Sequence, residues 1–194
     1  MKRIAILLLG LLIISLTPIM ITDIVTYNDE IEVYDNEPTL IEIELPQGKD
    51  TKNKTYMDYK LITDKSSPQY KFIQENCRVS DNGFLMVDDE WYCVALGNYF
   101  SDSIGTKYII TLENGNQIKV VKTEIKDNLH TCDLNYQHKI DGSVIEFLLD
   151  TTKLQDKKTQ NGYLWNGNLN NVDEFKGNII RIERVVAIIL PKML

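Results

Sequence analysis

Short strand-like runs separated by turn signals occupy most of the chain from Met57 onward. Such closely spaced runs are typical of an all-β sandwich or barrel, and they leave little room for helices. We therefore expect an all-β fold with strands over 60–62, 70–73, 84–87, 91–96, 107–112, 117–122, 144–149 and 178–186.

Turn residues indicate how some of these runs pair. Asn114-Gly115 lies between the runs 107–112 and 117–122 and tolerates the positive φ of a type I′ turn, so these two runs should form a hairpin. A second hairpin is expected around Asp81-Asn82-Gly83. Residues 151–162 could form a short helix or an exposed loop, and residues 161–171 read as loop.

The first 24 residues read as an export signal rather than as part of the folded domain. Lys2 and Arg3 precede an apolar run over residues 4–22, as in a signal peptide. No Ala-x-Ala-like cleavage site follows the run, so we expect an uncleaved signal-anchor that forms a membrane helix. The basic N-terminus would stay in the cytoplasm and the main domain would be extracytoplasmic. If the segment is cleaved, the protein is secreted.

The remaining chain is acidic, which limits its partners. We expect an acidic stalk over 25–56 and one β-barrel domain over 57–194. The whole chain has a net charge of −7, which becomes −8 without residues 1–24. Nucleic acids and anionic membrane surfaces are bound through basic patches, so neither is expected as a partner of this domain. Soluble or polymeric partners fit better.

The three cysteines suggest one pair and one remaining thiol. Cys77 and Cys93 flank the hairpin at 81–83, and an oxidising compartment would permit a disulfide between them. Cys132 is then left over. An alternative is that Cys132 is a nucleophile with His130 or His138 as its base, which only the folded geometry could establish.

The loop over 126–140 contains several residue types that bind metals. Their spacing matches no standard ligand pattern, so we expect neither a metal site nor a cofactor. The residues concerned are Asp127, His130, Cys132, Asp133 and His138.

Glu146 is the unusual residue of the run Ser143–Leu149, where both strand faces are otherwise apolar. An unpaired charge buried there would cost several kcal/mol, so the carboxylate must be paired, protonated or functional. A dry setting raises a carboxyl pKa, as general acid catalysis requires. The alternative is a carboxylate satisfied by a basic side chain or by backbone amides.

Glu124 is a second candidate acid, at the end of the 117–122 run and on the same face as Ile118, Val120 and Lys122 by strand alternation. Two acids on separate strands could cleave a glycosidic bond if their separation suits. Aromatic residues that could contact sugars surround this region, although a β-protein core also uses many of them: Tyr92, Tyr99, Phe100, Tyr108 and Tyr136.

Four short motifs follow one another between Tyr92 and Asp150: Val94–Tyr99, Ile104–Tyr108, Leu112–Gly115 and Asp141–Phe147. In order and spacing this stretch resembles the double-psi β-barrel domains of the 3D (Asp-Asp-Asp) and rare lipoprotein A type. Such domains occur in bacterial cell-wall proteins, and the stretch upstream from Met57 is similar to small exported or phage-encoded proteins of Gram-positive bacteria.

The resemblance implies a double-psi β-barrel-like fold and a role at the cell wall. Active members are lytic transglycosylases that cleave peptidoglycan with a barrel Asp as acid/base. The positions that match are Glu146 and Glu124. If the chain is an enzyme, we expect Glu146 to be the general acid and Glu124 its partner acid, with Lys126 and Tyr99 as substrate contacts. The alternative is a non-catalytic extracytoplasmic module that binds wall polymer or another protein, and a third possibility is a purely structural protein.

Overall fold

The computed structural model describes residues 25–27, 30–32, 38–46, 49–132, 134–155 and 168–186. The chain divides into two compact units, residues 1–37 and 38–194. In the first unit, β1 (Val25–Tyr27) pairs antiparallel with β2 (Glu30–Glu32). The expected membrane helix over 4–22 lies outside the described residues. Within the described part, no helix has both the length and the apolar character needed to cross a membrane.

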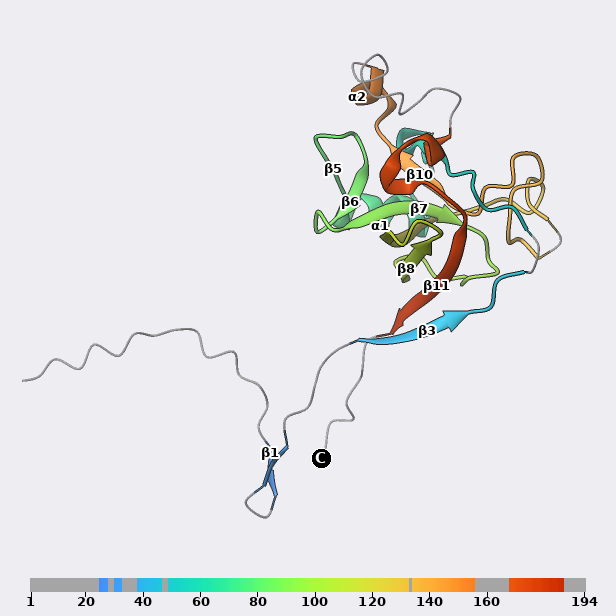
Figure 1. The fold of residues 1–194 in the computed structure, drawn as a ribbon. Helices are drawn as coiled ribbons and strands as arrows, with labels where there is room; N and C mark the ends of the chain where they lie inside the picture. Colours follow the sequence, from blue (N-terminus) through green and yellow to red (C-terminus); the bar gives the residue numbers. More distant parts are fainter. Residues whose placement is uncertain are drawn as a thin grey trace, which may run out of the picture. The chain divides into compact units, whose positions relative to one another are not determined.

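The second unit is built on one mixed sheet, so the expectation of a predominantly β fold is confirmed (Figure 1). Two of its strand pairs are parallel, β7 (Trp91–Leu96) with β9 (Gln117–Ile125) and β10 (Glu146–Leu149) with β4 (Thr55–Asp58). The other pairs of this sheet are antiparallel. β5 (Arg78–Val79) and β6 (Leu85–Val87) join the sheet through β7. The main strand order is β3 (Thr39–Ile43), β11 (Ile179–Val186), β8 (Lys107–Leu112), β9 (Gln117–Ile125), β7 (Trp91–Leu96), β10 (Glu146–Leu149) and β4 (Thr55–Asp58).

Six of the eight expected strands are present, and two of the expectations are wrong. Residues 60–62 fall largely in the 3₁₀ helix η1 (Tyr59–Leu61), and residues 70–73 lie inside α1 (Pro68–Asn76). Ser67 caps α1, since its hydroxyl accepts a hydrogen bond from the Tyr70 N–H at 3.1 Å. Pro68 at the first turn favours the same start. The cap therefore outweighs the β-propensity of Tyr70, Phe72 and Ile73.

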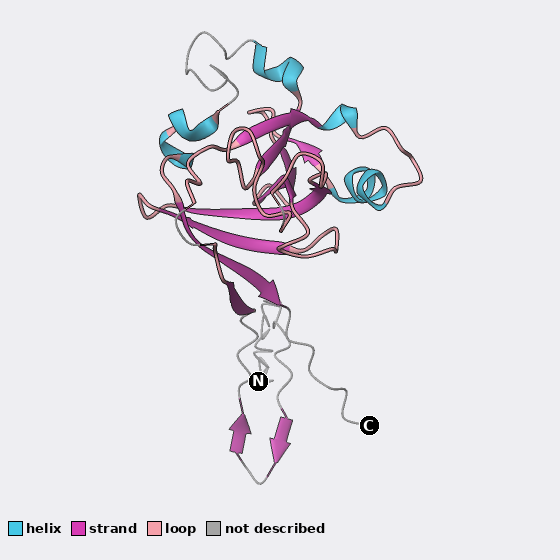
Figure 2. Ribbon diagram, turned by 90° about the vertical axis from the view of Figure 1, so that its right-hand side faces the viewer, coloured by secondary structure: helices cyan, strands magenta, loops and turns pink. Residues whose placement is uncertain are grey.

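Three more short helices complete the described chain: α2 (Thr151–Gln155), η3 (Leu169–Asn171) and η4 (Asp173–Phe175). The residues 156–167, which include most of the expected loop around Trp165, lie outside the described part. Figure 2 shows the helices around the strands of this unit.

The hairpin at Asn114-Gly115 is confirmed, but its turn differs from the expected type I′. Only Gly115 has a positive φ, of 86°, and its N–H donates to Leu112 O at 2.9 Å. This is a type I turn followed by a left-handed glycine. The expected hairpin at 81–83 joins β5 to β6 and has the same geometry at Gly83, with a φ of 86°.

A type I′ turn occurs instead between β6 and β7. Its central residues Asp88 and Asp89 have φ values of 55° and 53°, and Glu90 N–H donates to Val87 O at 3.2 Å. Aspartate tolerates this left-handed conformation better than most residues do.

The sheet has an apolar cluster on each face. The first cluster includes Val94, Leu96 and Phe147, and the second includes Cys93 and Leu148 together with Ile73 from α1. Alternate residues of β7 and β10 therefore face different clusters, as strand geometry requires. Helix α1 covers the second cluster.

Part of the segment expected to be a stalk belongs to the second unit. β3 pairs with β11, and Thr51 is buried with its hydroxyl 2.8 Å from the Ile179 N–H. The side chain of Lys54 is also fully buried. From Pro38 onward these residues share one compact unit with the rest of the domain.

Candidate functional site

Glu146 is the first residue of β10, and it is half-buried rather than enclosed. The sequence placed it in the middle of a strand over 144–149, but Val144 and Ile145 precede the strand and occupy the first apolar cluster. The desolvation of Glu146 is therefore only partial. Its carboxylate interacts electrostatically with the ammonium group of Lys126.

Glu124 shares a sheet face with Glu146, although not the face expected from alternation. A register shift at Val94/Ala95 pairs Ala95 with Glu124 on one side, and Ala95 pairs with Glu146 on the other. Register partners project to the same face, so both acids lie on the face of the second cluster. Two strand spacings separate their Cα atoms by about 9.5 Å.

The carboxylate of Glu124 is held in place by two donors. Its Oε1 accepts from Gln69 Nε2 of α1 at 3.2 Å and from the Ile125 N–H at 2.7 Å. Ala95, between the two acids, is 1% exposed.

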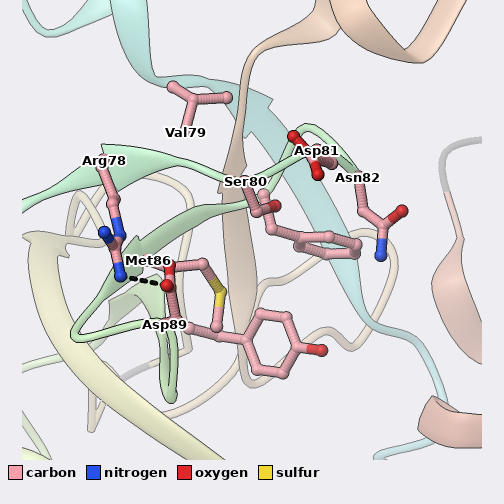
Figure 3. Close-up of a pocket in the computed structure, with 9 residues that line it drawn as sticks. Arg78, Val79, Ser80, Asp81, Asn82, Met86 and Asp89 are labelled. Carbon is pink, nitrogen blue, oxygen red and sulfur yellow. Dashed lines mark ion pairs between the residues drawn. The ribbon is translucent and has the colours of Figure 1, made fainter.

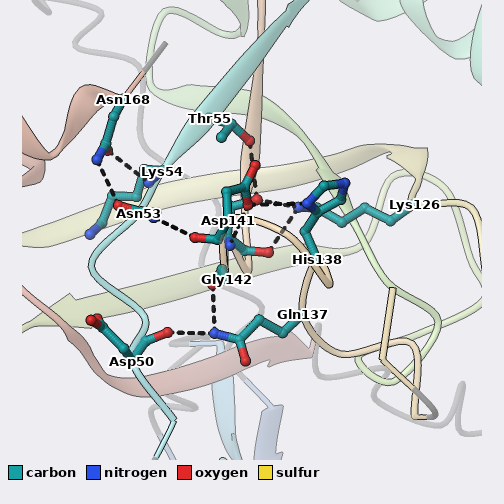
Figure 4. Close-up of polar contacts among 11 residues, drawn as sticks. Asp50, Asn53, Lys54, Thr55, Lys126, Gln137, His138, Asp141, Gly142 and Asn168 are labelled. Carbon is teal, nitrogen blue, oxygen red and sulfur yellow. Dashed lines mark hydrogen bonds and ion pairs between the residues drawn. The ribbon is translucent and has the colours of Figure 1, made fainter. Parts of the chain in front are cut away.

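Lys126 is 6% exposed, so burial removes it from the role of an exposed substrate contact (Figure 4). Its Nζ donates to the carbonyl oxygen of Ser143 at 3.0 Å and to its hydroxyl at 3.1 Å. In the same network, His138 Nδ1 lies 3.3 Å from Asp141 Oδ1. The arrangement fastens the loop after β9 to the start of β10.

Tyr99 lies apart from the two acids. Its hydroxyl donates to Glu44 O at 2.7 Å, and its ring packs edge-on against Phe100 and Tyr136 beside the first cluster. The structure therefore brings Glu146, Glu124 and Lys126 into one region but does not add Tyr99 to it.

Lys54, Lys122 and Lys126 form a group of buried lysines that donate to backbone carbonyls. Their acceptors include Gly177 O for Lys54, Gly97 O for Lys122 and Ser143 O for Lys126. Desolvation lowers the pKa of each from 10.5 to about 8. The folded domain thus holds three ammonium groups that release their protons more readily than in the unfolded chain.

We expect the domain to become more stable as the pH rises from 7.5 to 9. Over this range the folded chain loses lysine protons that the unfolded chain keeps. For each of these lysines, the free energy of unfolding therefore rises by up to about 1.4 kcal/mol per pH unit.

At higher pH the free energy of unfolding falls again, because the folded chain keeps Cys93 and Tyr136 protonated while the unfolded chain ionises them. The hydrogen bond to Cys77 raises the pKa of Cys93, and burial raises the pKa of Tyr136. Urea titrations at several pH values measure the slope. If the free energy of unfolding stays constant or falls between pH 7.5 and 9, the lowered lysine pKa values are contradicted. Lys126→Met should reduce the rise of the free energy of unfolding with pH.

The cysteines and histidines have the following positions. Cys77 and Cys93 are free but adjacent, with 3.4 Å between their Sγ atoms, so the expected pair is close enough for oxidation to join it. Cys132 is half-buried, and among the described residues its thiol bonds to neither His130 nor His138. Burial opposes ionisation of Cys132, but hydrogen bonds from nearby backbone N–H groups have the larger combined effect and lower its pKa.

Asp133 of the loop over 126–140 lies outside the described residues. Among the described residues, no group of three or more metal-binding side chains occurs.

A hollow of about 520 Å³ lies between the β5–β6 hairpin and the β6–β7 turn, and we call it the Arg78 pocket (Figure 3). This volume is in the usual range for small-molecule sites. Polar groups surround aromatic and thioether side chains, and Arg78 forms an ion pair with Asp89. The lining residues are Arg78, Val79, Ser80, Asp81, Asn82, Phe84, Met86, Asp89 and Tyr92.

The Arg78 pocket places polar groups around an aromatic wall. The Ser80 hydroxyl oxygen is buried and has no hydrogen-bond partner among the described residues. Phe84 and Tyr92 pack edge to face with 5.0 Å between ring centroids. Of the residues that line the pocket, only Tyr92 was predicted from the sequence as a possible sugar contact. The signal in the sequence that points to the pocket is the close succession of two acidic turns, 81–83 and 88–89, around one short strand.

None of the predicted site residues Glu124, Glu146, Lys126 and Tyr99 lines this pocket or the two smaller hollows beside α1. A comparison of the chain with protein-family models and with curated proteins finds no match.

Proposed function

We propose that this protein is an extracytoplasmic module that binds cell-wall glycan without cleaving it, with the Arg78 pocket as the sugar site. The proposal includes membrane attachment through residues 4–22, with the main domain outside the cytoplasm, or secretion if that segment is removed. A net charge of −8 over the exported part agrees with a polymer partner other than nucleic acid.

The observation that carries the proposal is the lining of the Arg78 pocket. Sugars present apolar ring faces together with many hydroxyl groups, and the pocket offers the half-buried ring of Tyr92 beside carboxylate, amide and guanidinium groups. The two candidate acids lie outside it, and Ala95 between them is buried. These facts favour binding over catalysis.

We further propose that the sheet is a double-psi β-barrel of the type that the four motifs resemble. The parallel pairs β7–β9 and β10–β4 within an otherwise antiparallel sheet support this assignment. Each parallel pair joins strands that a crossover connection separates in the sequence.

Asp89→Gly should weaken binding to purified peptidoglycan about tenfold while leaving the domain at least as stable. It removes a carboxylate from the pocket and the charge partner of Arg78, and glycine suits the positive φ of position 89. Co-sedimentation of the full-length protein in detergent with peptidoglycan measures the affinity.

Asp88→Gly is the matched control, because it changes the same turn but lies outside the pocket lining. It should sediment like the wild type. Failure of the wild type to sediment, or equal loss in both variants, would overturn the proposal.

A second candidate is glycan cleavage by Glu146 as general acid with Glu124 as its partner. The position of both acids on one sheet face, as register neighbours of Ala95, favours it. Release of anhydro-muropeptides by the wild type but not by Glu146→Gln would establish the lytic transglycosylase activity of similar families in place of simple binding.

A further inference from the structure

Cys77 and Cys93 lie on one face of the sheet, and the third cysteine lies on the other. Cys93 belongs to the second apolar cluster and Cys77 packs against it, whereas Cys132 packs against the first cluster. The Sγ atoms of Cys77 and Cys93 are 3.4 Å apart, so these two thiols already face each other. Of the three cysteines, only this pair is therefore placed for a disulfide within one chain.

The two thiols of this pair differ in their access to solvent. Cys93 lies inside β7 and is 0% exposed. Cys77 is half-buried at the end of α1, and it lines a hollow of about 270 Å³ together with Tyr59, Gln74 and Arg78. The hydrogen bond to Cys77 and burial raise the pKa of Cys93, which disfavours its thiolate. An oxidant in solution therefore meets Cys77 first.

We infer that Cys77 and Cys93 form an oxidation site, in which Cys77 reacts first with a disulfide oxidant that enters the hollow and Cys93 then completes an internal disulfide. The oxidant is of the class of glutathione disulfide, which accepts two electrons. This inference does not depend on glycan binding.

The reaction is a thiol–disulfide exchange in two steps. Cys77 loses its proton to solvent, and its sulfur attacks the oxidant, whose S–S bond breaks and releases one thiolate that takes up a proton. Cys93 then loses its proton, and its sulfur attacks the Cys77 sulfur. The bond between Cys77 and the oxidant breaks and the second thiol leaves. Two cysteine thiols are oxidised, and one disulfide is reduced to two thiols.

The new bond would fasten the end of α1 to the middle of the sheet. β7 pairs with β9 on one side and with β10 on the other, so Cys93 is carried by an interior strand. α1 contributes Ile73 to the second cluster, and Gln69 near its start donates to Glu124. The bond would also close the loop over 78–92, which lowers the entropy of the unfolded chain. Oxidation should therefore raise Tm by about 6 °C.

The test incubates the reduced full-length protein in detergent with glutathione disulfide and locates the products by peptide mapping after the remaining thiols have been alkylated. We expect a link between Cys77 and Cys93 and no link from Cys132 to either of them. The oxidised protein should show the higher Tm, and reduction with dithiothreitol should restore the lower one. A wild type that keeps both thiols free, or that links Cys132 to either, would overturn the inference.

Two matched variants test the order of the steps. Cys93→Ser should stop after the first step, with one glutathione held on Cys77. Cys77→Ser should leave Cys93 free, because no oxidant reaches a fully buried thiol while the domain is folded. Glutathione on Cys93 in the Cys77→Ser variant would overturn the assigned order. Formation of the link without a rise in Tm would overturn its role as a fastening of α1.

Discussion

Gly97→Ala should destabilise the domain by about 4 kcal/mol or more, because the added methyl group has no space. A Cβ at this position would lie 1.6 Å from Asn135 O and 2.4 Å from Asn135 Oδ1. The first of these atoms is backbone, so the loop that carries it would have to move as a whole. Overpacking of this severity belongs to the small class of substitutions with very large effects.

The loop around Asn135 has little freedom to move away from Gly97. Asn135 is itself in the left-handed region, with a φ of 50°, and its N–H donates to Cys132 O at 2.7 Å. Its side chain accepts from the Asn98 N–H and donates to Lys126 O, both at 3.1 Å. Displacing the loop would break these bonds together.

Thermal unfolding measures the effect of Gly97→Ala, and a fall of about 12 °C in Tm is expected for a domain of this size. Gly115→Ala is the control. A Cβ added at Gly115 would meet no atom within 4 Å, but the residue has a φ of 86°. Gly115→Ala should therefore cost about 1–2 kcal/mol through backbone strain alone. If Gly97→Ala and Gly115→Ala lower Tm by the same amount, the loop around Asn135 can move to make room for the added methyl group, and the prediction is wrong.

Lys122→Met should cost about 3 kcal/mol, the second largest effect that we expect. The Lys122 side chain is fully buried and its Nζ donates to the carbonyl oxygens of Gly97 and Ser101. Methionine fills nearly the same volume but donates nothing, so these acceptors are left unsatisfied at about 1–3 kcal/mol each. Removal of the buried charge offsets part of this cost.

Lys119→Met is the matched control on the same strand. Lys119 is exposed and paired with Glu90 at the surface, so its loss should cost less than about 1 kcal/mol. Urea unfolding of both variants gives the comparison. If Lys122→Met is as stable as the wild type, the lysine is not required to satisfy the loop carbonyls.

The strands rich in β-branched and aromatic residues could be read from the sequence. β7, β8 and β11 have almost the expected bounds, since each is a short run of such residues bounded by turn residues. The run at 70–73 could not be read in this way, because it is short and its structure follows from the capping hydrogen bond of Ser67. In such short runs a capping residue favours a helix while β-branched and aromatic residues favour a strand. The packing of α1 on the second cluster shows that the helix forms here.

The candidate sites depended even more on tertiary structure. Alternation alone placed Glu124 on the face of Val120 and Lys122, but the register shift at Val94/Ala95 turns it to the face of Glu146. A one-residue slip reverses every later side chain, and nothing in the local sequence marks its position. The Arg78 pocket likewise combines residues of two successive turns that become neighbours only after β6 has paired with β5 and β7.

The sequence by itself thus determined that the chain from Met57 is predominantly β, where its main hairpins lie, and that Cys77 and Cys93 would be neighbours. These properties follow from side-chain period and turn chemistry, which act over a few residues. The tertiary structure alone decided that Lys54, Lys122 and Lys126 are buried, that Glu146 is half-exposed, and that a pocket forms beside Arg78. Burial and register depend on contacts between residues far apart in the chain, and those contacts exist only in the assembled sheet.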